Sequence, residues 1–237
     1  MMSGNNTAIC DMPDGFTISS LCKGKQEVWI MEALDLELQR DRFLKIFDEQ
    51  IGEREGKEAL RDWLTGDDCD FFIAPASTKY HGSYDGGLCE HSIDVYEMAI
   101  RLEGLYREDI RKQYLVLNRP YDQAQFLESL TLAALFHDLC KANFYRSKTN
   151  GRSSYFTVDE QLPFGGHGSK SVFVLSKYLK DIRDEEAIAI NCHMGFSRAN
   201  DSSISIGESF HYSPLAWIIH VADEAATFML DRGIPDA

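Results

Sequence analysis

Residues 122–141 read DQAQFLESLTLAALFHDLCK, and this stretch carries the clearest helical pattern in the chain. Phe126, Leu130, Ala133, Ala134 and His137 fall at i, i+4, i+7, i+8 and i+11. This spacing gathers them on one face of a helix. The pattern therefore predicts a helix from Asp122 to Lys141, packed by that face into a core, with a His137-Asp138 doublet near its end.

Helical patterns recur on both sides of this stretch. They predict helices over residues 26–51, 56–64, 88–105, 169–179, 184–192 and 214–230, with Ser169 as an N-cap and Pro214 in a first turn. Strand signals are weak, and residues 153–158 are the best candidate for a short strand. We expect an all-α fold, a helical bundle with long loops and at most a short β element. Its parts would be an arm (1–25), N-terminal helices packing on the core (26–66) and a main domain (67–237), forming one compact unit.

Composition narrows the class of protein. The chain has 237 residues, of which 44% are hydrophobic, so a buried core is expected, and its formal net charge is −14. This charge argues against a protein that tracks along extended nucleic acid, but not against a small anion in a locally positive pocket. We see no secretory signal, no membrane-length apolar run and six scattered cysteines, which together favour a cytoplasmic protein with reduced thiols.

The His137-Asp138 doublet is ambiguous by itself. A buried histidine at the end of an apolar stripe is more often a structural group bonded to a carbonyl, and adjacent side chains on a helix diverge by about 100°. Asp223 adds to the signal, because it lies inside the apolar last helix and a buried carboxylate needs a partner. The remaining candidates are histidines at predicted helix ends: His91, His167 and His193. Four imidazoles and two carboxylates suffice to hold a pair of divalent ions.

The ordered set resembles a known family. His91, His137-Asp138 and Asp223 look like the HD superfamily of metal-dependent phosphohydrolases, and His167 and His193 resemble the extra ligands of its two-metal members. The words LFHDLCK (135–141), GHG (166–168), HMG (193–195) and HVAD (220–223), with residues 74–92, are similar to the HD domain of the YhaM-type 3′–5′ exoribonuclease group. Residues 1–60 lack a counterpart of the OB-type module of that group. The closer likeness is to stand-alone HD hydrolases of bacteria and phages, over about residues 70–230.

The resemblance implies roles for individual residues. The first metal ion would be held by His91, His137, Asp138 and Asp223. The second would be held by His167 and His193, with Asp138 bridging. Two divalent ions (Mn, Fe, Ni, Zn or Mg) would then activate water for attack on phosphorus.

Further residues are candidates for catalysis and substrate binding. Lys141 matches the last letter of the HDxxK word and, with Asp138, is a candidate catalytic residue, although a solvated lysine at a helix end is the plainer interpretation. His81, Arg146 and Lys170 are candidates for binding the substrate phosphate, with Lys141. Arg146 belongs to a basic run (Lys141, Arg146, Lys148, Arg152) that can equally be a solvated loop.

One further histidine and three cysteines lie near the predicted ligands. His220 precedes Asp223 by three residues and is a candidate to support a metal ligand from behind. Cys89, Cys140 and Cys192 each lie near a predicted ligand, and we interpret them as small core residues rather than thiolate ligands.

Three functions remain open at this point, beside the alternative of a structural helical protein with incidental histidines, which predicts no bound metal. The first is a phosphomonoesterase or phosphodiesterase acting on a nucleotide or small phosphate ester, with no membrane partner. The second is a regulatory HD module that binds a nucleotide without hydrolysing it. The third is a 3′–5′ exonuclease on short RNA or DNA.

Overall fold

The computed structural model describes residues 26–149, 154–158, 166–198 and 205–230, and side chains from Asp35 onward. The predicted arm (1–25) lies outside these residues. The chain divides into two units, Met1–Leu34 and Asp35–Ala237, and everything below concerns the second. The domain boundaries predicted from the sequence remain a prediction.

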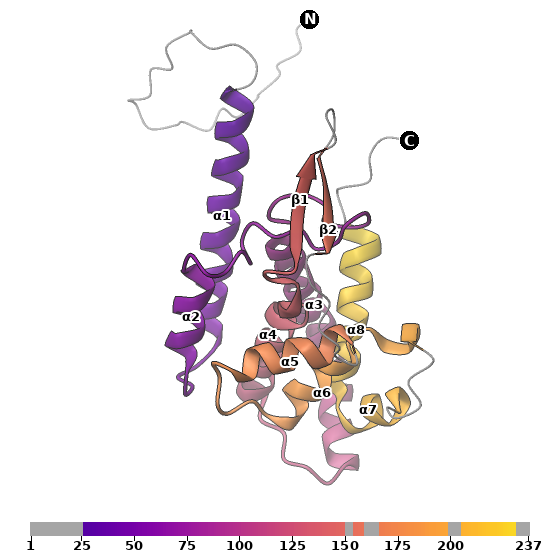
Figure 1. Ribbon diagram of the computed structural model, residues 1–237. Helices are drawn as coiled ribbons and strands as arrows, with labels where there is room; N and C mark the ends of the chain where they lie inside the picture. The colour runs from indigo at the N-terminus through magenta and orange to yellow at the C-terminus, as the bar shows by residue number, and fades with distance from the viewer. Residues whose placement is uncertain (1–25, 150–153, 159–165, 199–204, 231–237) are drawn as a thin grey trace, which may run out of the picture. The chain divides into compact units, whose positions relative to one another are not determined.

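The described part of the chain is helical apart from one small sheet, which confirms the predicted all-α class. In chain order its elements are α1 (Gln26–Gln50), α2 (Lys57–Thr65), α3 (Gly87–Val116), α4 (Gln123–Phe136), η1 (Leu139–Lys141), β1 (Tyr145–Thr149), β2 (Ser154–Val158), α5 (His167–Ser176), α6 (Asp184–Cys192), η2 (Gly195–Arg198), α7 (Ile206–Tyr212), α8 (Pro214–Ala225) and η3 (Ala226–Leu230). Figure 1 labels the principal helices and strands.

A bundle of five helices positions the site. Helix α3 packs against α4 and α8, and α6 packs against α4, α5 and α8. Phe136, at the end of α4, is fully buried and meets Phe43 and Phe47 of α1 edge to face, with ring centroids 5.8 Å apart in each pair. The end of α4 is therefore anchored in the hydrophobic core.

Two helix starts are set by their capping residues. The Asp122 side chain accepts a hydrogen bond from the Gln125 backbone N–H, and Ser213 caps α8 in front of Pro214, which confirms the predicted start there. The predicted cap at Ser169 is wrong. Helix α5 begins at His167, so Ser169 lies within its first turn.

Helix α3 is longer than predicted, because it continues to Val116 rather than ending at residue 105. Ile110 and Tyr114, four residues apart, are buried and extend its inner face. Leu105 is 71% exposed, and this apolar residue on the outer face interrupts the pattern from which the end was predicted. Helix α7, with none of its side chains buried, was also missed.

The small sheet, formed by β1 and β2, comes directly after η1 in the chain. β1 and β2 pair antiparallel with Tyr145 opposite Val158 and Arg146 opposite Thr157. Residues 153–158 were predicted as a strand, and β2 confirms it at Ser154–Val158. β1 was not predicted, because its exposed polar and basic side chains give no apolar alternation. None of the described helices combines the length and apolar character needed to cross a membrane.

Candidate metal centre

The predicted helix over residues 122–141 is wrong at its C-terminal end, and this error matters for the site. Helix α4 ends at Phe136; His137 is its C-cap, and Asp138 has φ −108° and ψ 20°. A tight turn follows, in which the Lys141 N–H donates to the Asp138 carbonyl (2.9 Å). Because the chain leaves the helix between the two residues, His137 and Asp138 do not diverge as they would on a helix. His137 Nε2 lies 3.5 Å from Asp138 Oδ2.

This turn is held from outside by the loop before α3. Asn143 has a left-handed backbone conformation, with φ 57°. Its N–H donates to Asp70 Oδ1 (2.5 Å), and its side chain donates to the Asp68 carbonyl (2.7 Å). Contacts between residues far apart in sequence therefore fix the position of the His137-Asp138 doublet.

His137 and His193 are held in the same way by the ends of two different helices. Each is a C-cap, and each donates from Nδ1 to the carbonyl three residues earlier, His137 to Ala134 (2.8 Å) and His193 to Ile190 (2.6 Å). A carbonyl only accepts, so in the neutral ring Nδ1 carries the proton and Nε2 presents a lone pair. Both side chains are fully buried, with ring centroids 5.0 Å apart. Hydrogen bonding thus prepares both Nε2 atoms as ligands.

His91 and Asp223 approach from α3 and α8. His91 Nε2 lies 3.2 Å from His137 Nε2 and 3.0 Å from Asp223 Oδ1. Asp223 Oδ1 lies 3.8 Å from His137 Nε2. Asp138 faces both sides of the cluster, with Oδ2 4.0 Å from His91 Nε2 and Oδ1 3.6 Å from His193 Nε2. Five of the six predicted ligands are thereby brought together.

His167, the sixth, lies at the first turn of α5. Its ligand atom and those of Asp138 and Cys140 all fall within 4.8 Å of one another. The close approach of α5 to α6 requires glycine at 168, because a Cβ there would lie 2.5 Å from the carbonyl oxygens of Ile190 and Asn191. This contact places the start of α5 against the end of α6, which carries His193.

The electrostatics favour ionised carboxylates next to a buried cation. Burial acts to raise the pKa of Asp138, but the charge of Lys141, with the contacts of His137 and His193, outweighs it and holds that pKa well below its usual range. For Lys141, burial lowers the pKa, but the charge of Asp138 prevails and raises it. Burial likewise acts to raise the pKa of Asp223, and the hydrogen bond from His91 with the nearby histidines lowers it overall. At neutral pH both carboxylates are therefore available as anionic ligands.

The cluster fits divalent metal ions. Nitrogen and oxygen ligands about 2.0–2.2 Å from one ion stand roughly 3 to 3.6 Å from each other. Three separations in the cluster match this range: His91–Asp223 (3.0 Å), His91–His137 (3.2 Å) and His137–Asp138 (3.5 Å). The His137–Asp223 and His91–Asp138 separations are longer, at 3.8 and 4.0 Å. Two buried atoms, Asp138 Oδ1 and His193 Nε2, have no hydrogen-bond partner. Buried polar atoms are ordinarily satisfied, and a bound cation would satisfy both. His91, His137 and Asp138 can share one ion, and Asp138, Cys140 and His167 another.

Of the predicted substrate residues, Lys141 and His81 adjoin the cluster. Lys141 Nζ lies 2.5 Å from Asp138 Oδ2. The His81 ring lies 4.9 Å from that of His91, and burial lowers its pKa to about 4, so it is neutral at pH 7. The loop carrying His81 contacts the start of α3 closely, since a Cβ at Gly87 would lie 2.1 Å from the Gly82 carbonyl oxygen.

Arg146 and Lys170 are placed less directly. Arg146 projects from β1 with an exposed side chain. Lys170 Nζ lies over the Phe144 ring, 4.4 Å from its centroid. Arg152, the last residue of the predicted basic run, lies outside the described residues.

His220 supports the cluster from behind. Its Nδ1 donates to the His193 carbonyl (2.7 Å), and its ring stacks on Phe210. Gly195, with φ 53°, passes so close to this ring that a Cβ would lie 2.3 Å from it. The HMG word thus pairs a histidine with the glycine that lets the chain turn against His220.

Cys140 also lies against the cluster. It is buried, as its interpretation as a small core residue predicted, and its Sγ lies 3.6 Å from His167 Nδ1, a contact that the sequence did not predict. The sequence signal for Cys140 is its position in the motif HDLCK (137–141), two residues after Asp138. The direction of its side chain is set by the turn that ends α4.

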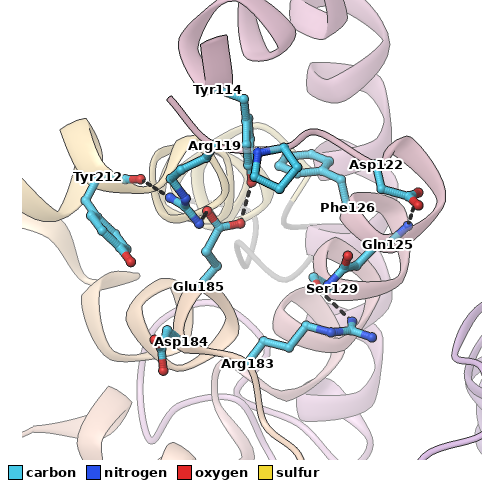
Figure 2. A pocket seen from close by; sticks show the side chains of 11 residues that line it. Tyr114, Arg119, Asp122, Gln125, Phe126, Ser129, Arg183, Asp184, Glu185 and Tyr212 are labelled. Atoms are coloured by element: carbon cyan, nitrogen blue, oxygen red, sulfur yellow. Dashed lines mark hydrogen bonds and ion pairs between the residues drawn. The ribbon is translucent and has the colours of Figure 1, made fainter. Parts of the chain in front are cut away.

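A separate cavity of about 290 Å³ includes none of these residues (Figure 2). Both arginines of its lining already have partners. Arg119 pairs with Glu185, which also accepts from Tyr114, and Arg183 donates to Ser129. Arg183 also pairs with Glu128 and Glu186, which are not part of the lining. Since both Arg119 and Arg183 are already paired with carboxylates, neither is free to bind an anion in this cavity. We therefore assign the chemistry to the histidine–aspartate cluster.

Comparisons with known proteins identify the family of the chain. The HD domain family matches residues 88–227. The chain is 28% identical over 169 residues to the dihydroneopterin 2′,3′-cyclic phosphate phosphodiesterase of Methanocaldococcus jannaschii. The match covers 68% of this chain and 54% of that protein, so the chain spans about half the length of the curated relative it matches. No solved structure matches significantly. The chain belongs to the HD-domain family, as the resemblance of its sequence predicted.

Proposed function

We propose that this protein is a divalent-metal-dependent phosphohydrolase that acts on a nucleotide or another small phosphate ester. The observation that carries the proposal is the buried cluster of five candidate ligands (His91, His137, Asp138, His193 and Asp223), in which Asp138 Oδ1 and His193 Nε2 lack hydrogen-bond partners. Family membership supports it. The phosphodiesterase name of the archaeal relative supports testing cyclic diesters first.

In this proposal the ligands form two sets that share one carboxylate. His91, His137, Asp138 and Asp223 hold a first ion, and His167 and His193 hold a second, with Asp138 between them. Bound divalent ions supply a nucleophilic water at neutral pH and neutralise charge on the phosphoryl oxygens.

The chain's own residues do the remaining work. The buried Lys141 ammonium stands beside the shared carboxylate, where it stabilises negative charge that develops on the phosphoryl group. The neutral His81 donates a hydrogen bond to the ester. Arg146 and Lys170 attract the anion and orient it. Because the molecule as a whole is acidic (−14), this local cationic region selects small anions over an extended polymer.

A cytoplasmic location is part of the proposal. Cys69, Cys89, Cys140 and Cys192 are all unpaired, which fits a reducing compartment.

Metal analysis and an activity panel test the proposal. Protein purified with Mn²⁺, Fe²⁺ or Zn²⁺ should bind the ion and hydrolyse members of a panel of nucleoside 2′,3′-cyclic phosphates, nucleoside monophosphates and bis-p-nitrophenyl phosphate. His137→Ala and Asp138→Asn should abolish turnover, whereas the exposed His211→Ala should leave it unchanged.

Each alternative has its own outcome. Metal-replete protein that turns over no member of the panel contradicts the proposal. Thermal stabilisation by a nucleotide that is not consumed supports the regulatory module instead. Release of mononucleotides from short RNA or DNA, with no hydrolysis of the small esters, supports the exonuclease.

A further inference from the structure

Cys140 faces the half of the cluster that contains His167. Its side chain is 2% exposed, and Sγ lies 3.6 Å from His167 Nδ1. The sulfur, an oxygen of Asp138 and a ring nitrogen of His167 all lie within 4.8 Å of one another. A sulfur, a nitrogen and an oxygen atom therefore lie close together, with Cys140 and Asp138 buried and His167 partly buried.

The position of the sulfur is imposed by its backbone. The Cys140 N–H donates to Oγ of Ser171 (3.1 Å), a fully buried residue of α5. Ser171 lies four residues after His167, one helical turn further along the same face. One helix thus carries both the hydroxyl that holds the Cys140 backbone and the imidazole that Sγ faces.

The separation of the atoms fits joint coordination. A thiolate about 2.3 Å and an imidazole about 2.1 Å from one tetrahedral ion stand roughly 3.6 Å apart, and the observed distance is 3.6 Å. An independent observation points to the same place. Asp138 is 3% exposed, yet its Oδ1 has no hydrogen-bond partner. Asp138 Oδ1 is therefore a buried acceptor that a bound cation would satisfy.

We propose that Cys140 is a direct ligand of the second metal ion, together with His167 and Asp138. This inference rests on the proposed two-metal site. On binding, the thiol S–H bond breaks, its proton passes to solvent, and a sulfur–metal bond forms without any change of oxidation state. A sulfur, nitrogen and oxygen donor set favours Zn²⁺, Fe²⁺ or Co²⁺ over Mg²⁺. The second metal position would therefore have a softer set of ligand atoms than the first.

Cobalt spectroscopy on the full chain tests the ligand directly. Titration of the apoprotein with Co²⁺ should produce a thiolate-to-cobalt charge-transfer band in the near ultraviolet. Cys140→Ser should abolish the band and lower the affinity for the second equivalent of Zn²⁺ by about tenfold or more. Cys89→Ser and Cys192→Ser, which remove buried thiols outside the predicted ligand set, are the matched controls and should retain both.

Several outcomes would overturn the inference. Two equivalents of Co²⁺ bound without the band, or a band that survives in Cys140→Ser, would assign Cys140 to orienting His167 by a hydrogen bond. The proposed phosphohydrolase would then still stand. Failure to bind Co²⁺ at all would defeat both proposals. Should Cys140→Ser not fold, X-ray absorption of the cobalt-loaded wild-type chain decides, since a sulfur shell at about 2.3 Å is required.

Discussion

Lys141 Nζ lies 2.5 Å from Oδ2 of Asp138, and both side chains are buried. The ammonium therefore contacts the carboxylate that the proposal assigns to both metal ions. It holds Asp138 ionised, because its charge lowers the pKa of that group. The same positive charge opposes a cation arriving at the same oxygen atoms. The lysine thus has opposite effects on metal binding and on the stabilisation of phosphoryl charge.

This contact predicts a separation of the two properties in Lys141→Met, which retains an unbranched apolar side chain but loses the charge. Turnover should fall by about a hundredfold or more, as for loss of one group that stabilises transition-state charge. Metal affinity should be retained or increased, measured by isothermal titration calorimetry. If metal affinity and turnover fell together, Lys141 would be a structural partner of Asp138 rather than a catalytic residue.

Metal should stabilise the fold through Asp138. Ions at a hundred times their Kd add about 2.7 kcal/mol to the free energy of unfolding, so chelation should lower Tm. Asp138→Asn, which nearly conserves shape, should remove the dependence of Tm on added metal. The exposed His211→Ala should respond to metal as the wild type does. A wild-type Tm insensitive to both metal and chelator contradicts the metal centre.

Gly195→Ala tests how the position of His193 is maintained. The added methyl group would meet the His220 ring at 2.3 Å on a backbone with φ 53°, so the ring must move and release the His193 carbonyl. We expect a loss of about 1 to 2 kcal/mol in stability from the backbone conformation alone, and a 10- to 100-fold loss of affinity for one of two ions. Denaturant unfolding and metal titration measure the two effects.

Gly104→Ala is the matched control for this change. Gly104 lies inside α3, and a Cβ there would meet nothing within 4 Å. Alanine should raise the free energy of unfolding by about 1 kcal/mol and leave the metal affinity unchanged. Equal effects of the two substitutions on metal binding would argue against a role of the His220 contact.

A buried ion pair at the start of α6 should dominate the stability of the helix that carries His193. Arg54 Nη1 lies 2.8 Å from Glu186 Oε1, with side chains 1% and 0% exposed, and Ser129 donates to the same oxygen. Glu186→Gln should cost about 3 kcal/mol, the lower end for a broken buried pair, because the buried Arg54 loses Glu186 and keeps only the half-exposed Asp181 as a charged partner. Asp109→Asn, which removes the exposed pair with Lys112, should change stability by less than about 1 kcal/mol. Urea unfolding of the three proteins compares them, and similar values for both variants would contradict the prediction.

The amino-acid sequence by itself determined the fold class and the ordered histidines and aspartates. Periodic apolar residues decide which face of a helix is buried, so α4, α6 and α8 were predictable from local spacing. The helix start at Pro214 was predictable because proline fits the first turn of a helix. A functional role for Asp223 was predictable because a carboxylate in an apolar helix needs a partner.

Only the tertiary structure decided where the side chains of the cluster point. An unbroken helix would separate His137 from Asp138, and the turn that joins them depends on Asp70 and Asn143, which lie 73 residues apart. The contact of Cys140 with His167 depends on α5 packing against that turn, and the position of His193 depends on the His220 ring against Gly195. Such contacts join residues remote in sequence, and no local pattern of hydrophobicity encodes them.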